Sequence, residues 1–389
     1  MCCNLRFLSI VIVFLVGGST VFAQQKTKRV CDTIPYEYIH DKIVIPVIVN
    51  GVKVKYIVDT GGQTGTMWEY AQEMGAKATG ATTNISDLNG VGQNFQMATV
   101  ENVELGPNYK LAELKTMVLG TVGFFEDLEV AGILGGDAFA QSVITFDSRK
   151  QIMVINYPYR PEGLKVTDGV EMFTGNTHHS IVNMDFGGVE KQVLFDTGAQ
   201  GFLIIPKNDF QDLQQRGVCE EVAKAYGISG VGLAGLSDPG DIYKGNIREM
   251  TFLGKRFSDV GCVTSIGNTT IIGVDLLKYG KVVLDYMRKR FYFFPFDDSV
   301  QDMGGAPKTW NVGILPANGR FEVTTVWESM KDEVSFGDQV VDINGTSLAN
   351  LPMSQLEIDK IMNAIEGDTG YIIVVKEGKE KKIEIRRER

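Results

Sequence analysis

The chain has 389 residues, with 38 basic and 48 acidic side chains and a net charge of −10 at pH 7. This length allows two or three domains, and a hydrophobic content of 44% is enough to form their cores. An acidic chain without a basic stripe argues against nucleic acids and anionic membranes as partners.

The first 23 residues have the pattern of a secretory signal peptide. Arg6 is the only charged residue before an apolar run from Phe7 to Val16, and small residues follow up to Ala23. The run is short for a membrane-spanning helix, and an uncleaved anchor is the alternative. We therefore expect an exported protein that is periplasmic, associated with the cell envelope or secreted, with no transmembrane span after cleavage. Three cysteines then remain and allow at most one disulfide: Cys31, Cys219 and Cys262.

Strand signals dominate the chain after this segment. Short β-branched and aromatic runs alternate with Gly and Asn turns, and two segments between them read as helical: Trp68 to Ala76, and Asp209 to Tyr226. Turn-rich stretches at Tyr159–Gly163 and Asp297–Pro307 divide the chain further. These breaks predict a first lobe over 35–158, a second over 168–296 and a C-terminal domain over 308–389.

The two predicted lobes share one sequence motif. Ile57–Gly61 and Leu194–Gly198 each run from an apolar strand into Asp-Thr-Gly, and Asp59 and Asp196 are 137 positions apart (196 − 59). Two further segments recur in the same order, at offsets of 140 and 138: Gly90-Val91-Gly92 as Gly230-Val231-Gly232, and Ile133–Asp137 as Ile271–Asp275. Several anchors at a nearly constant offset predict two homologous lobes.

The duplicated phrase can bring two carboxyl groups to one site. Two carboxylates held close together cannot easily both ionise, so they share a proton. The ionised member can take a proton from water while the protonated member polarises the carbonyl of a peptide bond. We predict Asp59 and Asp196 as this catalytic pair. Glycine permits close backbone approach and threonine can hydrogen-bond between the lobes, so four neighbours are predicted to support the loops: Thr60, Gly61, Thr197 and Gly198.

An Asp-Thr-Gly phrase followed by an apolar-apolar-Gly segment, 74 (133 − 59) or 75 (271 − 196) residues later, resembles the aspartic peptidases, especially the retropepsin-like group. Retropepsins assemble two single-lobe subunits, whereas one chain carries both lobes here, as in pepsins. The resemblance covers roughly residues 35 to 296. It implies a mainly β fold of two acid-protease β-barrel lobes with the active site between them. It also implies that Gly90-Val91-Gly92 and Gly230-Val231-Gly232 are flaps that close over a peptide.

Residues 308–389 resemble a PDZ domain, a small α+β unit. A strand over Gln339–Ile343 lies between two glycine turns, a hairpin is centred on Gly378, and a helix carries four apolar residues on one face: Ile358, Ile361, Met362 and Ile365. PDZ domains bind an extended peptide beside a strand and often capture its C-terminal carboxylate. The matching loop here is Val312-Gly313-Ile314-Leu315. The alternative is a PDZ-like unit that only packs against the lobes.

Together these patterns predict an exported aspartic endopeptidase without a cofactor, acting on a peptide or unfolded protein. The alternative is a non-catalytic peptide-binding or adaptor protein with the same fold. Gly230–Gly235 fits the dinucleotide pattern G-x-G-x-x-G, but a turn follows it in place of the required helix. The three histidines, His40, His178 and His179, lack the spacing of a zinc site, and we interpret the adjacent pair as part of a solvated loop.

One departure from pepsins bears on pH dependence. Pepsins usually place Ser or Thr after Asp-Thr-Gly, where this chain has Gly62 and Ala199. Loss of a hydrogen bond to the ionised carboxylate raises its pKa. We therefore expect the pH–rate profile on an unfolded protein to peak at a less acidic pH than that of pepsin. An optimum below about pH 3 contradicts this inference.

Overall fold

The computed structural model describes residues 28–86, 92–233 and 235–389. It is mainly β, with 54% strand and 13% helix, which confirms the predicted fold class at this level. The predicted signal peptide, together with Gly90 and Val91, lies outside the described residues. Among the residues that are described, no helix is long and apolar enough to cross a membrane.

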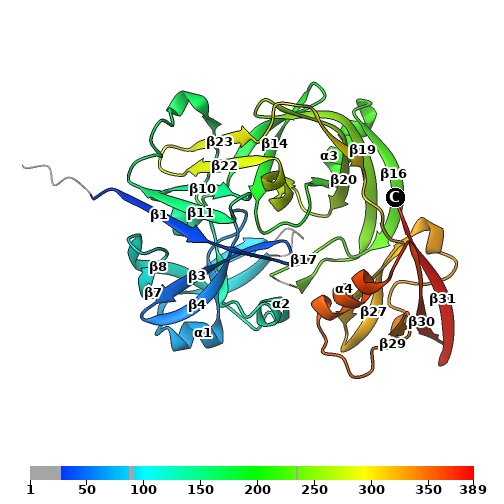
Figure 1. The fold of residues 1–389 in the computed structure, drawn as a ribbon. Helices are drawn as coiled ribbons and strands as arrows, with labels where there is room; N and C mark the ends of the chain where they lie inside the picture. Colours follow the sequence, from blue (N-terminus) through cyan, green and yellow to red (C-terminus); the bar gives the residue numbers. More distant parts are fainter. Residues whose placement is uncertain (1–27, 87–91, 234) are drawn as a thin grey trace, which may run out of the picture.

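Two closed six-stranded β-barrels form the main body (Figure 1). The strands of the first barrel are, in order, β3 (Lys42–Val49), β4 (Val52–Val58), β9 (Gly132–Leu134), β5 (Gly65–Met67), β8 (Lys110–Leu119) and β7 (Gly92–Glu104). Those of the second are β13 (Ile181–Phe186), β14 (Val189–Asp196), β21 (Thr270–Gly273), β15 (Leu203–Pro206), β20 (Lys255–Ser265) and β19 (Gly240–Phe252). Equivalent strands follow the same order, so the sequence repeat corresponds to a repeated folding unit.

Further elements extend each barrel in the same way. A helix follows the fourth strand of each barrel, and a hairpin strand lies outside it: α1 (Trp68–Glu73) and β6 (Lys77–Ser86) in the first, α3 (Lys207–Gln215) and β16 (Cys219–Gly227) in the second. The helix predicted up to Tyr226 was therefore wrong in its second half. Gly217, at φ 72°, ends α3, and the residues after it pair with β19 instead.

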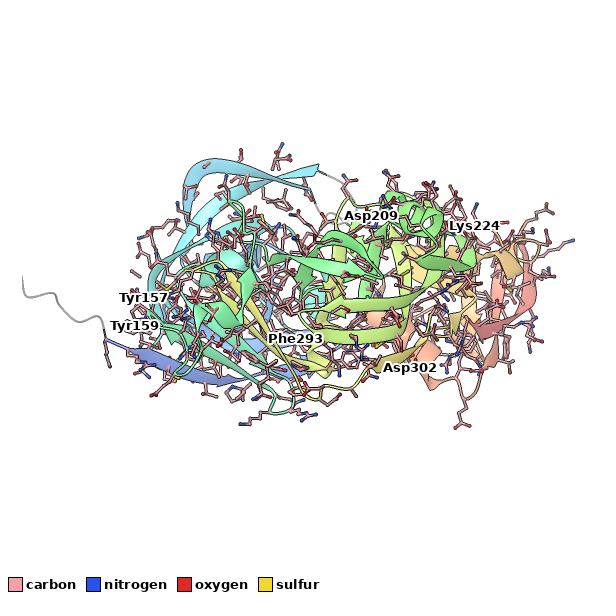
Figure 2. All side chains as sticks on the ribbon, turned by 90° about the horizontal axis from the view of Figure 1, so that it is seen from above. Tyr157, Tyr159, Asp209, Lys224, Phe293 and Asp302 are labelled. Carbon is pink, nitrogen blue, oxygen red and sulfur yellow. The ribbon has the colours of Figure 1, made fainter. Side chains whose placement is uncertain are left out.

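A separate six-stranded sheet joins the two halves. Its strands are, in order, β1 (Val30–Pro35), β11 (Ile152–Tyr157), β10 (Val143–Asp147), β22 (Gly280–Asp285), β23 (Arg290–Pro295) and β12 (Val170–Glu171). The junction is the antiparallel pair β10–β22, which aligns Val143 with Asp285. Figure 2 labels Tyr157 at the end of β11 and Phe293 within β23, one from each half of this sheet. The sheet therefore contains strands from both halves of the chain, joined at β10 and β22.

The C-terminal domain contains the predicted strand, helix and hairpin. They are β28 (Gln339–Ile343), α4 (Gln355–Ala364) and the pair β30 (Thr369–Lys376) and β31 (Lys379–Glu388). The loop conformation predicted for the peptide-binding residues Val312–Leu315 was wrong, because they lie in β26 (Val312–Ala317), paired with β27 (Arg320–Trp327). Their role in peptide binding stays a prediction. Asn318-Gly319, both at positive φ, form the turn of this hairpin, and that dipeptide between apolar residues is its sequence signal.

The remaining short elements connect these units. They are β2 (Glu37–Ile39), α2 (Gly123–Asp127), η1 (Gly136–Phe139), η2 (Val166–Asp168), β17 (Val231–Gly232), β18 (Gly235–Leu236), η3 (Val274–Lys278), β24 (Gln301–Gly305), β25 (Thr309–Trp310), η4 (Glu328–Met330) and β29 (Thr346–Ser347). Cys219 and Cys262 approach to 4.0 Å between their sulfur atoms across strand β19, whereas Cys31 is exposed. All three are free cysteines, and β19 separates the strands that carry Cys219 and Cys262.

The C-terminal domain packs against both barrels. Its strand β27 pairs with β16 of the second barrel, and the Lys244 ammonium lies 4.1 Å from the centroid of the Trp327 ring at this contact. On the other side, Leu356 of α4 is buried in an apolar cluster of the first barrel, and Ser354 donates a hydrogen bond to Asp127 of α2. The domain therefore bridges the two barrels.

This bridge can be tested by truncating Leu356. Leu356→Ala leaves a cavity between α4 and the first barrel and should lower the free energy of unfolding by about 2–4 kcal/mol. The neighbouring Met353 is 46% exposed, so Met353→Ala should change it by less than about 0.5 kcal/mol. Urea unfolding of both variants measures the difference. Equal midpoints for Leu356→Ala and the parent contradict the packing of α4 on the first barrel.

Candidate active site

Each aspartate lies at the end of a buried strand that is supported by a parallel neighbour. Strand β4 pairs in parallel with β9, and the amide of Asp59 donates to the carbonyl of Leu134 at 2.9 Å. Strand β14 pairs in the same way with β21, which places Asp196 opposite Gly273. The apolar-apolar-Gly segments seen in the sequence are therefore the strands that support the two aspartate loops.

The two threonines join these loops by reciprocal hydrogen bonds. The amide of Thr60 donates to Thr197 Oγ1, and the amide of Thr197 donates to Thr60 Oγ1, both at 3.1 Å. Each hydroxyl then donates to a strand carbonyl of the opposite barrel, Thr60 to Phe195 at 2.8 Å and Thr197 to Val58 at 2.7 Å. Both threonines are buried. Four hydrogen bonds thus fix the position of one aspartate loop relative to the other.

The glycine of each Asp-Thr-Gly motif lies against the carboxyl group of the other motif's aspartate. A Cβ atom on Gly61 would lie 2.3 Å from Cγ of Asp196, and one on Gly198 would lie 2.5 Å from Cγ of Asp59. Real Cβ contacts do not occur at such distances, so only glycine fits at these two positions. At Gly62 a Cβ would lie 2.8 Å from Oδ2 of Asp59, so a larger residue there would require the carboxyl group to shift.

The two carboxyl groups have unequal surroundings. Asp196 Oδ1 accepts hydrogen bonds from the amides of Gly198 at 2.7 Å and Ala199 at 3.2 Å, whereas Asp59 Oδ1 accepts one, from Gly61 at 3.0 Å. Burial, followed by the negative charge of Asp196 and a hydrogen bond between the two carboxyls, raises the pKa of Asp59 well above its ordinary range. The amide donors favour the ionised form at Asp196, so a proton shared by the pair is favoured on Asp59.

A cavity of about 630 Å³ opens over this pair and is lined from both barrels. Gly230, Val231 and Gly232, which were predicted to form a flap, line this cavity. In the first barrel the equivalent hairpin β6–β7 contributes Asn84 and Ile85. Gly92 begins β7 and is not among the lining residues, while Gly90 and Val91 lie outside the described part of the chain. Most other lining side chains are apolar: Ile57, Met117, Val122, Phe124, Phe125, Ile133, Ile181, Leu194, Ile228 and Leu233.

Several residues of the site were not identified from the sequence. Asp137 accepts hydrogen bonds from the Thr64 amide at 3.0 Å and from its hydroxyl at 2.7 Å, and so braces the loop after Asp59. Lys42 and His179 line the cavity on opposite barrels. His179 lies in a loop, as interpreted from the sequence, but it is partly buried and lines the cavity. The repeat carries a signal for these two, since each precedes its aspartate by 17 positions (59 − 42 and 196 − 179).

The C-terminal domain reaches the same cavity. Gln355, the first residue of α4, is a lining residue beside Phe124 and Phe125 of α2. Strand β27 of the same domain contacts the cavity wall formed by the second barrel: the carbonyl of Thr324 accepts a hydrogen bond from the Ile228 amide at 2.8 Å. Ile228 begins the segment that continues into Gly230–Gly232. The domain therefore contacts both the flap-like segment of the second barrel and the α2 wall of the first.

Within the described residues, no group of three or more His, Cys, Asp or Glu side chains is placed to hold a metal ion. The polar side chains that line the cavity are two carboxyl groups, one lysine, one imidazole, three hydroxyls and several amides. No protein-family model matches the sequence, and no curated protein is significantly similar to it.

The raised pKa of Asp59 leads to a prediction about stability. The folded chain retains the Asp59 proton to a higher pH than the unfolded chain, whose Asp pKa is about 4. The free energy of unfolding therefore falls as the pH rises from about 4 through the raised pKa. Asp59→Asn cannot ionise, so its melting temperature should exceed that of the parent by a few degrees more at pH 7 than at pH 4.

Thermal unfolding across this pH range tests the sign of the effect. Asp298 is exposed, so Asp298→Asn is the matched control and should show no pH-dependent difference from the parent. A constant or opposite difference for Asp59→Asn means that Asp59 ionises normally in the folded chain.

Proposed function

We propose that the chain is an exported aspartic endopeptidase in which Asp59 and Asp196 activate a water molecule. One observation carries the proposal: two equivalent barrels present their aspartates to one cavity, and Thr60 and Thr197 lock the two loops together. A protein that only binds peptides needs neither the carboxyl pair nor the burial that keeps one carboxyl protonated. The resemblance to retropepsin-like peptidases supports the same proposal.

The unequal carboxyl groups suit the two roles that peptide hydrolysis requires. Asp196, with two amides on one oxygen, takes a proton from water as the water oxygen attacks the carbonyl carbon. Asp59 gives its proton to the carbonyl oxygen, which produces a tetrahedral diol. Asp196 then passes its proton to the amide nitrogen, the C–N bond breaks, and Asp59 recovers a proton from a hydroxyl of the diol. Both carboxyl groups return to their starting states.

The cavity suits a peptide substrate. Its volume of about 630 Å³ lies in the range of ligand-binding clefts, and its walls are mostly apolar. Apolar side chains of an extended peptide therefore fit on both sides of the dyad. We further propose that the C-terminal domain is PDZ-like. Its edge strand β26 lies against α4, the arrangement in which PDZ domains take up a peptide strand.

Hydrolysis of an unfolded protein and of a mixed peptide library by the chain lacking residues 1–23 tests the proposal. Asp59→Asn and Asp196→Asn should each lower kcat/KM at least about a thousandfold, because each removes a proton-transfer group while preserving size. Asp298→Asn, at an exposed position, should leave kcat/KM unchanged. If the two dyad variants cut as well as the parent, the dyad proposal fails. Peptide binding without any hydrolysis by the parent supports the adaptor alternative.

A further inference from the structure

Lys42 occupies an unusual position beside the two aspartates. It is the first residue of β3 in the first barrel, yet its ammonium group donates a hydrogen bond to the carbonyl of Gly198 in the second. Gly198 is part of the Asp196 loop and donates its own amide to Asp196. The ammonium also lies 5.8 Å from the centroid of the Phe124 ring, which forms part of the cavity wall. Lys42 thus places a positive charge on the Asp196 side of the cavity.

Among the described residues, no carboxylate lies within ion-pair distance of this cation, although the charges of Asp196, Asp59 and Asp41 act on it from farther away. Apart from the imidazole of His179, the ionisable lining side chains among the described residues are Lys42, Asp59 and Asp196. In this described part of the chain, Lys42 forms no salt bridge within 4.0 Å. The dyad carries about one negative charge when it shares a proton, and that charge is engaged by amide donors. An ammonium group has three donors, and the carbonyl of Gly198 uses one.

A cation in an apolar cavity favours a ligand with a complementary charge. Burial lowers the pKa of Lys42, and the charges of Asp196 and Asp59 oppose this effect. Removing an ammonium group from water is costly unless it is paired and hydrogen-bonded. A carboxylate that reaches the ammonium forms a charge-assisted hydrogen bond, which is shorter and stronger than a neutral one. Such a ligand therefore offsets the desolvation of Lys42.

We infer that Lys42 selects substrates that carry a carboxylate close to the scissile bond, and this inference rests on the proposed peptidase function. The carboxylate belongs to an Asp or Glu side chain or to the C-terminus of the peptide. At the equivalent position of the second lobe, 137 residues later (179 − 42), the chain has His179 in place of a second lysine. Burial lowers the pKa of His179, which favours its neutral imidazole, although the charges of Asp59 and Asp137 oppose this effect. The preference is therefore confined to one side of the scissile bond.

Matched peptides test the inference. In a C-terminally amidated substrate, each position within three residues of the cleaved bond carries Glu or Gln in turn, and kcat/KM is measured at pH 6 to 7. At one or two positions on one side, Glu should be preferred by about tenfold or more, the strength of a hydrogen bond between charged groups. Free-acid and amidated peptides of graded length form a second arm, which shows whether a terminal carboxylate serves instead.

Four variants identify the residue responsible. Lys42→Met should abolish the Glu preference, Lys42→Arg should retain it, and Lys42→Glu should turn it into a preference for Lys over Gln. Lys53 is exposed on β4, so Lys53→Met is the matched control and should behave like the parent. Melting temperatures confirm that each variant is folded. A parent without any carboxylate preference, or a Lys42→Met variant that keeps it, overturns the inference.

Binding separates this inference from the proposed function. Calorimetry with peptides whose scissile amide is replaced by a reduced, uncleavable bond gives the Glu-to-Gln ratio without turnover. A Glu preference that depends on Lys42, in a chain that hydrolyses nothing, supports the role of Lys42 and contradicts the peptidase proposal. Hydrolysis with equal binding of the two peptides supports the peptidase proposal and overturns the role of Lys42.

Discussion

The hydrogen bonds between Thr60 and Thr197 are the constraint on which the rest of the site depends. Each amide donates to the opposite hydroxyl, and each hydroxyl donates to the strand that carries the opposite aspartate. These groups are buried, so breaking one bond leaves a polar atom without water, which costs about 1–3 kcal/mol. The barrels are therefore fixed relative to each other at the carboxyl groups themselves. The six-stranded sheet also joins the two halves, but it does not contain the aspartates.

The two Asp-Thr-Gly motifs are identical in sequence, but the surroundings of their carboxyl groups differ. The loop after Asp59 has Gly62, which leaves space for its carboxyl, and is braced by Asp137 through Thr64. The loop after Asp196 has Ala199, whose amide adds a second donor to the carboxylate. The lysine on this side adds a positive charge that has no counterpart on the other. The proposed hydrolysis requires an acid and a base at the same time, and these differences suit two residues of the same type to the two roles.

The repeat made the two barrels, the supporting strands and the aspartate pair predictable, because each depends on local patterns that occur twice in the chain. The helix predicted up to Tyr226 and the loop predicted at Val312–Leu315 failed because tertiary pairing decided between strand and other structures. The repeat marks Lys42 and His179 only by their equal spacing before the two aspartates, and Gln355 has no such signal. The entry of these side chains into the cavity depends on contacts between barrels and on the docking of α4, which spacing alone does not encode.

Binding of a transition-state mimic tests the central claim most directly, since it measures the dyad without relying on turnover. The ligand is a peptide with a secondary alcohol in place of the scissile amide, compared by calorimetry with the same peptide lacking the hydroxyl. If Asp59 and Asp196 hold the tetrahedral intermediate between them, the alcohol should bind the parent at least about a hundredfold more tightly, because it occupies the position of the diol. The two peptides should bind Asp59→Asn with nearly equal affinity. Equal affinities for the parent contradict a catalytic dyad at this site.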